Sequence, residues 1–334
     1  MSLDLPLIWG GLIAFAVLAY VVLDGFDLGV GILFPWVKGE AERDEMMNSV
    51  APVWDGNETW LVLGGGGLFA VFPLAYAVIM PALYAPIIVM LLGLIFRGVA
   101  FEFRWKTRAG KFLWDWAFGF GSTIAAFAQG VTLGALVQGI KVVDRAYAGG
   151  WWDWLTPFSL LTGLALVVGY ALLGATWLIL KTEATVQDHA YRYAAKLAPA
   201  TLGMIGIVSL WTPFLASAYR ARWFGWPSIL LTLPVPALVA LAAWALYTGI
   251  KNRHELSPFL AAQSLFVLSY LGLAISIYPN VVPGSLSIWQ AAAPDNSLSF
   301  LLYGAVVLIP MILLYTAYSY WVFRGKVLSG HGYH

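Results

Sequence analysis

Cysteine is absent from this sequence of 334 residues, and charged side chains make up only 10% of it. Without cysteine, the chain cannot form disulfides, a Cys-ligated zinc site, an iron–sulfur cluster or a thioether-attached haem. Soluble proteins usually carry about 25% charged residues, whereas 61% of the residues here are hydrophobic. The composition therefore predicts a polytopic protein embedded in a lipid bilayer. The net charge of +1 gives no indication of nucleic-acid binding.

Histidine is also scarce, and its placement excludes a further class of site. His189 and His254 lie in segments expected to be cytoplasmic loops, and His331 and His334 lie in the tail. Since none lies in an expected spanning segment, the chain offers no pair of axial ligands for a haem at membrane depth. We therefore expect no metal site in this chain, and we expect any haem of a complex to sit in another chain.

Long hydrophobic runs fill most of the sequence, and each is long enough to cross a bilayer. They predict an all-α polytopic membrane protein in which residues 1–334 form one integral membrane domain. The least secure boundary is the short break FPLAY around Pro73, and without it the number of spans falls from nine to eight. The nine expected spans are 7–34, 53–72, 76–99, 117–138, 157–180, 200–219, 227–248, 259–279 and 299–323.

Basic residues predict the orientation of these spans. With the N-terminus outside, the outer segments hold only four of the 18 basic residues, and the inner segments hold the other 14. This bias follows the positive-inside rule and predicts an N-out/C-in chain. Segment 181–196, KTEATVQDHAYRYAAK, is the most polar run, and we expect a cytoplasmic loop with a surface helix there.

Two aspartates interrupt the first hydrophobic run, in VVLDGFDLGVGIL (21–33). Asp24 and Asp27 are three residues apart, so a helix projects both from one face, in its inner half. Acids within a membrane span usually indicate a functional site such as a proton relay. The alternative is a pair of hydrated acids near the inner interface. Gly25 and Gly29 form a GxxxG spacing that permits close approach of another helix.

A second acidic pair begins the next span, in NSVAPVWDGNETWLVLGGGG (48–67). Ser49 is expected to cap this helix, with Pro52 near its first turn. Asp55 and Glu58 then fall in the first two turns, where acids suit the helix dipole. They either stabilise the helix N-terminus or join Asp24 and Asp27 in a proton entrance from the cytoplasm.

A third charged stretch is FRGVAFEFRWK (96–106) at the expected inner side. Glu102 and Lys106 are four residues apart and can pair in a helix. Arg97 is expected to pair with one of the inner-side acids. Arg97, Glu102 and Arg104 together predict an ion network at the inner face, with either a structural or a functional role.

Several long motifs resemble subunit II of the cytochrome bd-type quinol oxidases. They are DGFDLGVG (24–31), NSVAPVWDGNETWLVLGGGGLFAVFP (48–73), FRGVAFEFR (96–104), the segment from WDWLTPFSLLTGL (152–164) to GATWLILKTE (174–183), and ILLYTAYSYW (312–321). The second stretch and AFAQGVTLGALVQGI (126–140) are similar to the cyanide-insensitive branch of the family. The resemblance extends from the first expected span to the last.

The resemblance implies two four-helix bundles plus one peripheral helix, packed against a haem-bearing subunit I. Subunit I would carry two b-type haems, a haem d or a further b-type haem, and the site of quinol oxidation. The complex would reduce dioxygen to water with protons from the cytoplasm, in the cytoplasmic (inner) membrane of a prokaryote. The resemblance also leaves room for small single-helix subunits.

Site residues follow from the same motifs. The resemblance assigns Asp55 to a cytoplasmic proton channel between the two subunits and places Asp24 near that route. Glu58 stands where other branches of the family have an uncharged amide, and we expect Glu58 and Asp27 to join this proton pathway as further acids. It implies that Trp54 contacts a structural quinone or a lipid. Two alternatives stay open: a proton-coupled secondary transporter, and a purely structural subunit whose acids only pair with arginines.

Overall fold

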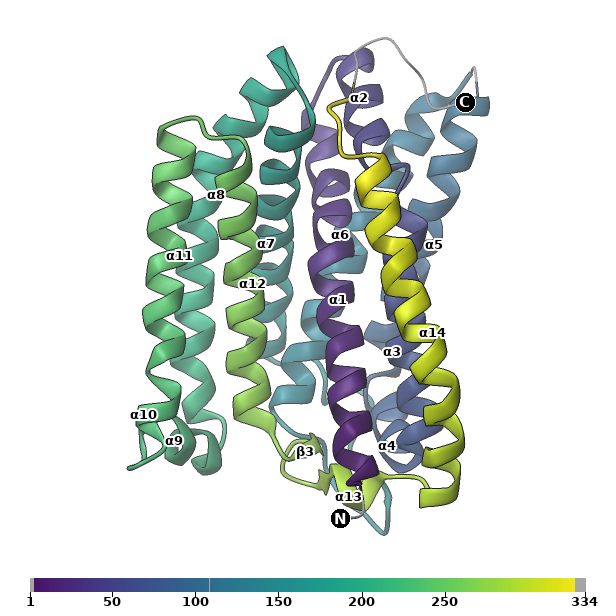
Figure 1. Ribbon diagram of the computed structural model, residues 1–334, viewed down its shortest axis with the longest axis vertical. Helices are drawn as coiled ribbons and strands as arrows, with labels where there is room; N and C mark the ends of the chain where they lie inside the picture. The colour runs from purple at the N-terminus through teal and green to yellow at the C-terminus, as the bar shows by residue number, and fades with distance from the viewer. Residues whose placement is uncertain (1–2, 108, 328–334) are drawn as a thin grey trace.

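The computed structural model describes residues 3–107 and 109–327, and this part of the chain is almost entirely helical (Figure 1). Within it, eight helices are long and apolar enough to span a membrane, or nine if α3 and α4 form one bent span. The all-α polytopic fold is thereby confirmed. The long helices are α1 (Leu5–Leu33), α3 (Trp54–Val71), α5 (Tyr84–Lys106), α6 (Lys111–Val137), α7 (Pro157–Lys181), α8 (Ala184–Trp211), α11 (Pro234–Lys251), α12 (Leu256–Ile277) and α14 (Asp295–Val322).

Short elements connect these helices at the two ends of the molecule. At one end α1 is followed by a 3₁₀ turn and by α2, a polar helix that begins with two acidic residues in its first turn. Two small antiparallel hairpins lie at the other end. The short elements are η1 (Phe34–Trp36), α2 (Glu40–Val50), α4 (Pro73–Ala82), β1 (Val142–Val143), β2 (Ala146–Tyr147), η2 (Thr212–Phe214), α9 (Ser217–Phe224), α10 (Ile229–Thr232), β3 (Asn280–Val282), β4 (Leu286–Ser287) and α13 (Ile288–Ala291).

The long helices pack as two groups of four, with α14 outside them (Figure 1). Helices α1, α3, α5 and α6 form one group, and α7, α8, α11 and α12 form the other. Helix α7 joins the groups because it packs against both α1 and α6. Among the residues of α14, only Leu298 is fully buried. The arrangement agrees with the predicted two bundles and one peripheral helix.

The contact between α1 and α7 depends on glycine. A Cβ placed on Gly29 would lie 1.9 Å from the carbonyl oxygen of Tyr170 and 2.6 Å from the backbone nitrogen of Gly174. No side chain fits into this space, so the two backbones touch. Small residues permit such close packing between membrane helices, and the predicted role of the GxxxG spacing is observed at Gly29.

The break at Pro73 is observed, but the third span lies further along the chain than predicted. Helix α3 ends at Val71, and α4 leaves it at an angle of 118°. The residue before a proline is disfavoured in the helical region, and Phe72 has φ −122° and ψ 62°. A second break at Leu83 separates α4 from α5. The predicted range 76–99 was therefore wrong, because the helix that can span begins at Tyr84 and continues to Lys106.

The polar segment 181–196 was predicted incorrectly as a loop with a surface helix. After a short break at Thr182 and Glu183, α8 begins at Ala184 and continues without interruption to Trp211. Its polar residues form the first turns of a long helix, and its apolar residues follow in the same helix. His189 therefore belongs to a helix long enough to span, in its second turn, although it was placed in a loop. His331 and His334 lie outside the described residues.

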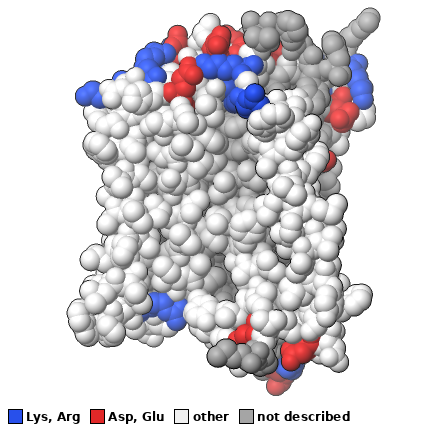
Figure 2. Space-filling model, in the orientation of Figure 1, with Lys and Arg blue, Asp and Glu red and all other residues white. Residues whose placement is uncertain are grey.

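Charged side chains concentrate at the two ends of the molecule and are nearly absent from the broad surface between them (Figure 2). More of them gather at the end that carries α2, where α14 also ends, than at the end where α1 begins (Figures 1 and 2). We call the first of these the inner end, following the predicted N-out/C-in orientation.

Candidate functional site

Two aspartates of α1 lie deep inside the first helix group. The side chains of Asp24 and Asp27 are completely buried, as is the side chain of Arg97 from α5. Arg97 Nη2 lies 3.0 Å from Asp24 Oδ1 and 3.9 Å from Asp27 Oδ2. Burying an unpaired charge is costly, so the guanidinium explains how α1 holds two carboxylates at this depth.

Helix α3 adds an acid and an amide to the same place. Arg97 Nη1 donates to Glu58 Oε1 at 2.6 Å, and Asn57 Nδ2 donates to Asp27 Oδ2 at 2.6 Å. The Tyr320 hydroxyl, from α14, donates to Asn57 Oδ1 at 3.0 Å. We refer to Asp24, Asp27, Asn57, Glu58 and Arg97 as the Arg97 cluster. It joins three helices of the first group, and Tyr320 connects it to α14.

The Arg97 cluster contains more acids than bases. With all groups ionised, three carboxylates and one guanidinium give a charge of −2. Both oxygens of Asp24, Oδ1 of Asp27, and Nε and Nη2 of Arg97 are buried without a protein hydrogen bond in the described part of the chain. The 3.0 Å contact of Asp24 is thus an ion pair without hydrogen-bond geometry. Buried polar atoms of this kind are commonly satisfied by water.

Glu58 is the partly exposed acid of the Arg97 cluster. Its side chain is 24% exposed, whereas those of Asp24 and Arg97 are at 0%. The contact between Glu58 and Arg97 therefore joins an accessible carboxylate to two inaccessible ones. Asp24 and Asp27 lie three residues apart on α1, and Glu58 lies in the first turns of α3. These acids meet here because α1 and α3 pack against each other.

The residues that precede Glu58 in the sequence, Asp55 and Trp54, lie outside the Arg97 cluster. Asp55 is exposed on α3, and its carboxylate forms no hydrogen bond or ion pair within the described residues. The Trp54 indole stacks on Phe101 with ring centroids 4.6 Å apart. Ser49 was expected to cap α3, and this was wrong. Ser49 belongs to α2 and donates to the Met46 carbonyl oxygen, whereas α3 begins after Val53 without a side-chain cap.

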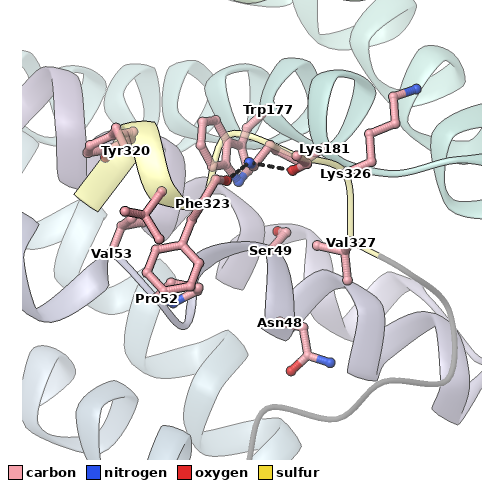
Figure 3. A pocket seen from close by; sticks show the side chains of 12 residues that line it. Asn48, Ser49, Pro52, Val53, Trp177, Lys181, Tyr320, Phe323, Lys326 and Val327 are labelled. Carbon is pink, nitrogen blue, oxygen red and sulfur yellow. Dashed lines mark hydrogen bonds between the residues drawn. The ribbon is translucent and has the colours of Figure 1, made fainter. Parts of the chain in front are cut away.

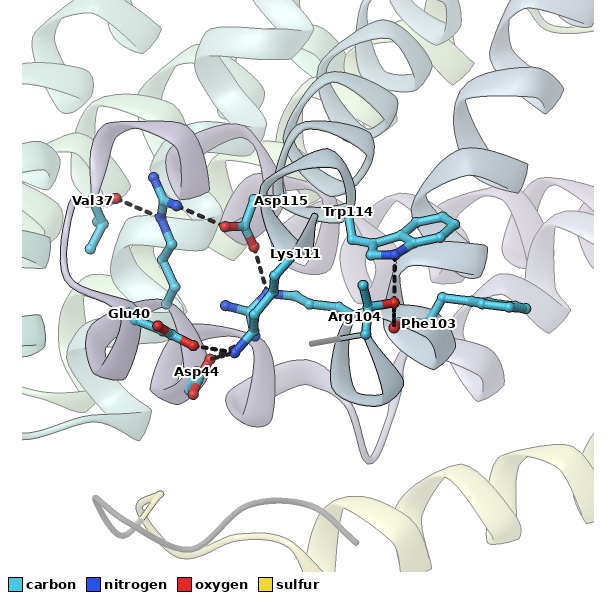
Figure 4. A network of polar contacts seen from close by, with 10 residues as sticks. Val37, Glu40, Asp44, Phe103, Arg104, Lys111, Trp114 and Asp115 are labelled. Carbon is cyan, nitrogen blue, oxygen red and sulfur yellow. Dashed lines mark hydrogen bonds and ion pairs between the residues drawn. The ribbon is translucent and has the colours of Figure 1, made fainter. Parts of the chain in front are cut away.

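A second ionic network lies closer to the inner end (Figure 4). Arg104 of α5 is fully buried and binds Asp115 Oδ1 and Asp44 Oδ1, each at 2.6 Å. Arg43 binds the other oxygen of Asp115 at 2.8 Å, and Lys111 binds Glu40 at 2.6 Å. This Arg104 network clamps α2 to α5 and α6. The hydrogen bond from Lys111 holds the pKa of the Glu40 carboxyl below its usual range.

The predicted ion network at the inner face is therefore two separate sites. Arg97 and Arg104 are seven residues apart on α5 and bind different acids. Glu102 joins neither, because it points outward and, among the described residues, pairs only with Lys106, at 3.2 Å. The pair of Glu102 and Lys106 was predicted by its spacing, but the inclusion of Glu102 in the network was wrong.

Several residues of these sites gave no usable signal in the sequence. Asp44 lies 60 residues before Arg104 on another helix, and Asn57 stands between two acids in the first turns of α3. Tyr320 lies more than 260 residues from Asn57. The only available signal was the WD pair at 114–115, near the start of α6. A third buried polar group was also missed: Gln129 donates to the Tyr20 hydroxyl and accepts from the Tyr170 hydroxyl.

The histidines of the described part do not form a haem site. His189 lies near the start of α8 with its Nδ1 3.1 Å from Glu42 Oε2, and His254 lies between α11 and α12. Neither is close to the middle of a span, and no group of three or more His, Asp or Glu side chains in the described residues is arranged to hold a metal ion.

The fold and the Arg97 cluster define a class: a multi-pass helical membrane protein with an arginine-bound group of buried acids near one membrane face. The family follows from comparison with known proteins. Residues 5–323 match the family model of cytochrome bd terminal oxidase subunit II. The chain belongs to this family, and it is thus a subunit of a respiratory terminal oxidase.

Individual relatives agree with the family assignment over nearly the whole chain. The chain is 31% identical to the cytochrome bd-I ubiquinol oxidase subunit 2 of Escherichia coli strain K12 over 361 residues, covering 97% of this chain and 95% of that protein. It is 30% identical to the cytochrome bd ubiquinol oxidase subunit 2 of Bacillus subtilis strain 168 over 330 residues, covering 96% of both. Its fold matches a chain in the structure of bd oxidase from Geobacillus thermodenitrificans with a TM-score of 0.75, 15% identity, and coverage of 96% of this chain and 99% of that one.

Proposed function

We propose that this chain is a haem-free subunit II that supports a haem-bearing subunit I in a quinol-oxidising, oxygen-reducing complex. The family assignment and the relatives named ubiquinol oxidase subunit 2 support this role. The lack of paired histidines at membrane depth in the described part supports placing two b-type haems and a haem d, or a further b-type haem, in subunit I. The family assignment also favours this role over an autonomous secondary transporter.

We further propose that the Arg97 cluster belongs to the route by which cytoplasmic protons reach the site of dioxygen reduction. The observation that carries this proposal is the contact of partly exposed Glu58 with Arg97, which also holds completely buried Asp24 and Asp27. A proton arriving at Glu58 can pass to the aspartates through water held by their unpaired oxygens. Asp55, exposed one turn earlier on α3, is a proton donor at the entrance to this route.

Contact of Trp54 with a quinone stays a prediction. One face of its indole is covered by Phe101, and Gly98 lies against its edge, where an added Cβ would be 3.4 Å away. These contacts explain its position by packing alone. Attachment of small single-helix subunits and use of the cyanide-insensitive chemistry are likewise predictions.

The test separates proton transfer from a purely structural role for the same acids. Asp24→Asn and Asp55→Asn are introduced into the complete complex, and oxygen consumption per haem is measured from neutral to alkaline pH. If these acids carry protons, turnover falls by about tenfold or more, equivalent to about 1.4 kcal/mol on the rate-limiting transfer, and the loss grows as protons become scarce. Glu102→Gln is the matched control, since Glu102 is exposed and its ion pair within the described residues is with Lys106.

A structural role gives a different result. Removing an acid that only pairs with Arg97 lowers the amount of assembled complex, but each assembled complex then turns over at the wild-type rate. Wild-type turnover per haem in both variants across the pH range would refute the proton-transfer role and leave the subunit assignment intact.

A further inference from the structure

Two cavities lie near the inner end of the molecule, and the smaller one reaches Asn57 of the Arg97 cluster. The larger has a volume of about 370 Å³ and is bounded by α2, α7, the turn before α3 and the end of α14. Asn48, Ser49 and Lys181 contribute polar groups to its wall, and Trp177 and Val53 contribute apolar ones (Figure 3). It lies at the inner end, which is the cytoplasmic side in the predicted orientation.

The roof of the larger cavity is fixed by hydrogen bonds. Lys181 Nζ donates to the Phe323 carbonyl oxygen and, at 2.8 Å, to that of Gly325. The backbone nitrogen of Val327 donates to the Lys181 carbonyl oxygen at 2.8 Å. Lys326 is held by Glu255 at 2.6 Å. The end of α14 is thereby tied to α7, so the cavity is a built feature of the fold.

The smaller cavity continues toward the buried acids. It lies between the first turns of α3 and the last turns of α14 and offers about 10 Å³ to the centre of a water molecule. A single water needs about 10–15 Å³ measured in this way. Gly56, Asn57, Thr316 and Ser319 line it, so its wall provides hydroxyl and amide groups for that water. Asn57 in turn binds Asp27 at 2.6 Å.

Tyr320 separates the two cavities. It lines both of them, together with Pro52 and Val53. Its hydroxyl is bound to Asn57 Oδ1 at 3.0 Å, and its ring lies edge-on to Trp177 with centroids 6.3 Å apart. Tyr320 therefore stands where the two cavities adjoin.

We propose that these cavities form a water inlet from the inner end to Asp27, between α3 and α14, with Tyr320 as its gate. Asp27 is bound by Asn57, which lines the smaller cavity, and the buried Oδ1 of Asp27 has no protein hydrogen bond in the described residues. The inlet rests on the proposed proton-transfer role of the Arg97 cluster and adds a path to it. It does not pass Asp55, which lines neither cavity.

The absence of cysteine from the chain permits a direct test. Thr316→Cys and Ser319→Cys are introduced singly into the complete complex, and a charged, membrane-impermeant methanethiosulfonate is added to inside-out vesicles. Labelling is measured on this chain after separation from its partners. Leu314→Cys is the matched control, because Leu314 is on the same helix and is 71% exposed on its apolar side.

A hydrated inlet gives labelling at 319 and 316 at least tenfold faster than at 314. Ser319→Leu fills the smaller cavity and slows labelling of Thr316→Cys by a similar factor, whereas Tyr320→Ala removes the gate and accelerates it. Labelling of both positions no faster than Leu314→Cys would overturn the inlet.

The inlet and the proposed function can fail separately. Labelling is measured without turnover, so it does not depend on proton transfer by the acids. If Asp24→Asn lowers turnover but Ser319→Leu leaves turnover unchanged, the inlet is overturned and the proton-transfer role stands. If the cysteines are labelled but Asp24→Asn leaves turnover unchanged, the proton-transfer role of the cluster is overturned.

Discussion

Replacement of Arg97 is the most informative perturbation of stability that the structure suggests. Its guanidinium is completely buried and lies 3.0 Å from Asp24 and 2.6 Å from Glu58. Arg97→Gln removes the only cation within the Arg97 cluster and leaves two wholly buried carboxylates without a counter-charge. Breaking a buried ion pair in this way typically costs about 3–5 kcal/mol, which corresponds to a roughly 10²- to 10⁴-fold change in the equilibrium between folded and unfolded forms.

The assay is the midpoint of unfolding of the purified complex when SDS is titrated into mixed micelles, with the loss of folded subunit as the readout. Lys106→Gln is the control on the same helix. Lys106 is 73% exposed and, in the part of the chain that the structure describes, pairs only with Glu102, so its loss is expected to change stability by about 0.5 kcal/mol at most.

A compensating variant tests whether the unpaired buried carboxylates cause the loss of stability. Combining Arg97→Gln with Asp24→Asn and Asp27→Asn removes the buried charges together, so most of the lost stability should return. The reasoning is refuted if Arg97→Gln unfolds within about 1 kcal/mol of the wild type, or if the triple variant is less stable than Arg97→Gln alone.

Two further predictions concern the fold. Gly29→Ala places a methyl group 1.9 Å from the Tyr170 carbonyl oxygen, so α1 and α7 must separate; we expect a loss of about 1–3 kcal/mol in the same assay, and no loss for Gly11→Ala, where nothing lies within 4 Å. Burial raises the pKa of the Glu45 carboxyl, on α2, above its usual 4.5. The native state therefore binds this proton more tightly than the unfolded state, and stability is lost as the pH rises above that value. Glu45→Gln should melt at a higher temperature than the wild type at neutral pH, with the difference shrinking as the pH is lowered toward 4.5 and absent below it; a difference that does not depend on pH would contradict the assignment.

The spans could be predicted because hydrophobic length and the distribution of basic residues depend on the bilayer and not on packing. The predicted boundaries of the spans were wrong where a helix extends beyond its apolar residues. Helix α8 begins in a polar segment, and α5 continues through Arg97 and Arg104 to Lys106. In both cases backbone hydrogen bonding extends the helix past the residues that favour the membrane. The 118° bend at Pro73 was indicated by proline, but the second break at Leu83 was not.

The candidate site was only partly accessible from the sequence. The shared face of Asp24 and Asp27 follows from helical periodicity, and the need for a buried cation made Arg97 a natural partner. The separation of Arg97 and Arg104 into two sites was not predicted, because it depends on which acids of other helices pack against each turn of α5. Asn57 and Tyr320 were missed because their contacts depend on how α3 and α14 pack, which no local pattern encodes.

The two ends of α14 have a consequence for biosynthesis. Near its beginning, the Leu298 carbonyl oxygen accepts from the indole Nε1 of Trp9, 289 positions earlier in the chain. At its other end it is held by Lys181. Helix α1 therefore keeps an indole donor without this acceptor until α14 has been inserted. A nascent chain that stops before α14 carries this unmet donor in its first helix, a defect that a membrane quality-control protease could use to tell an unfinished subunit from a complete one.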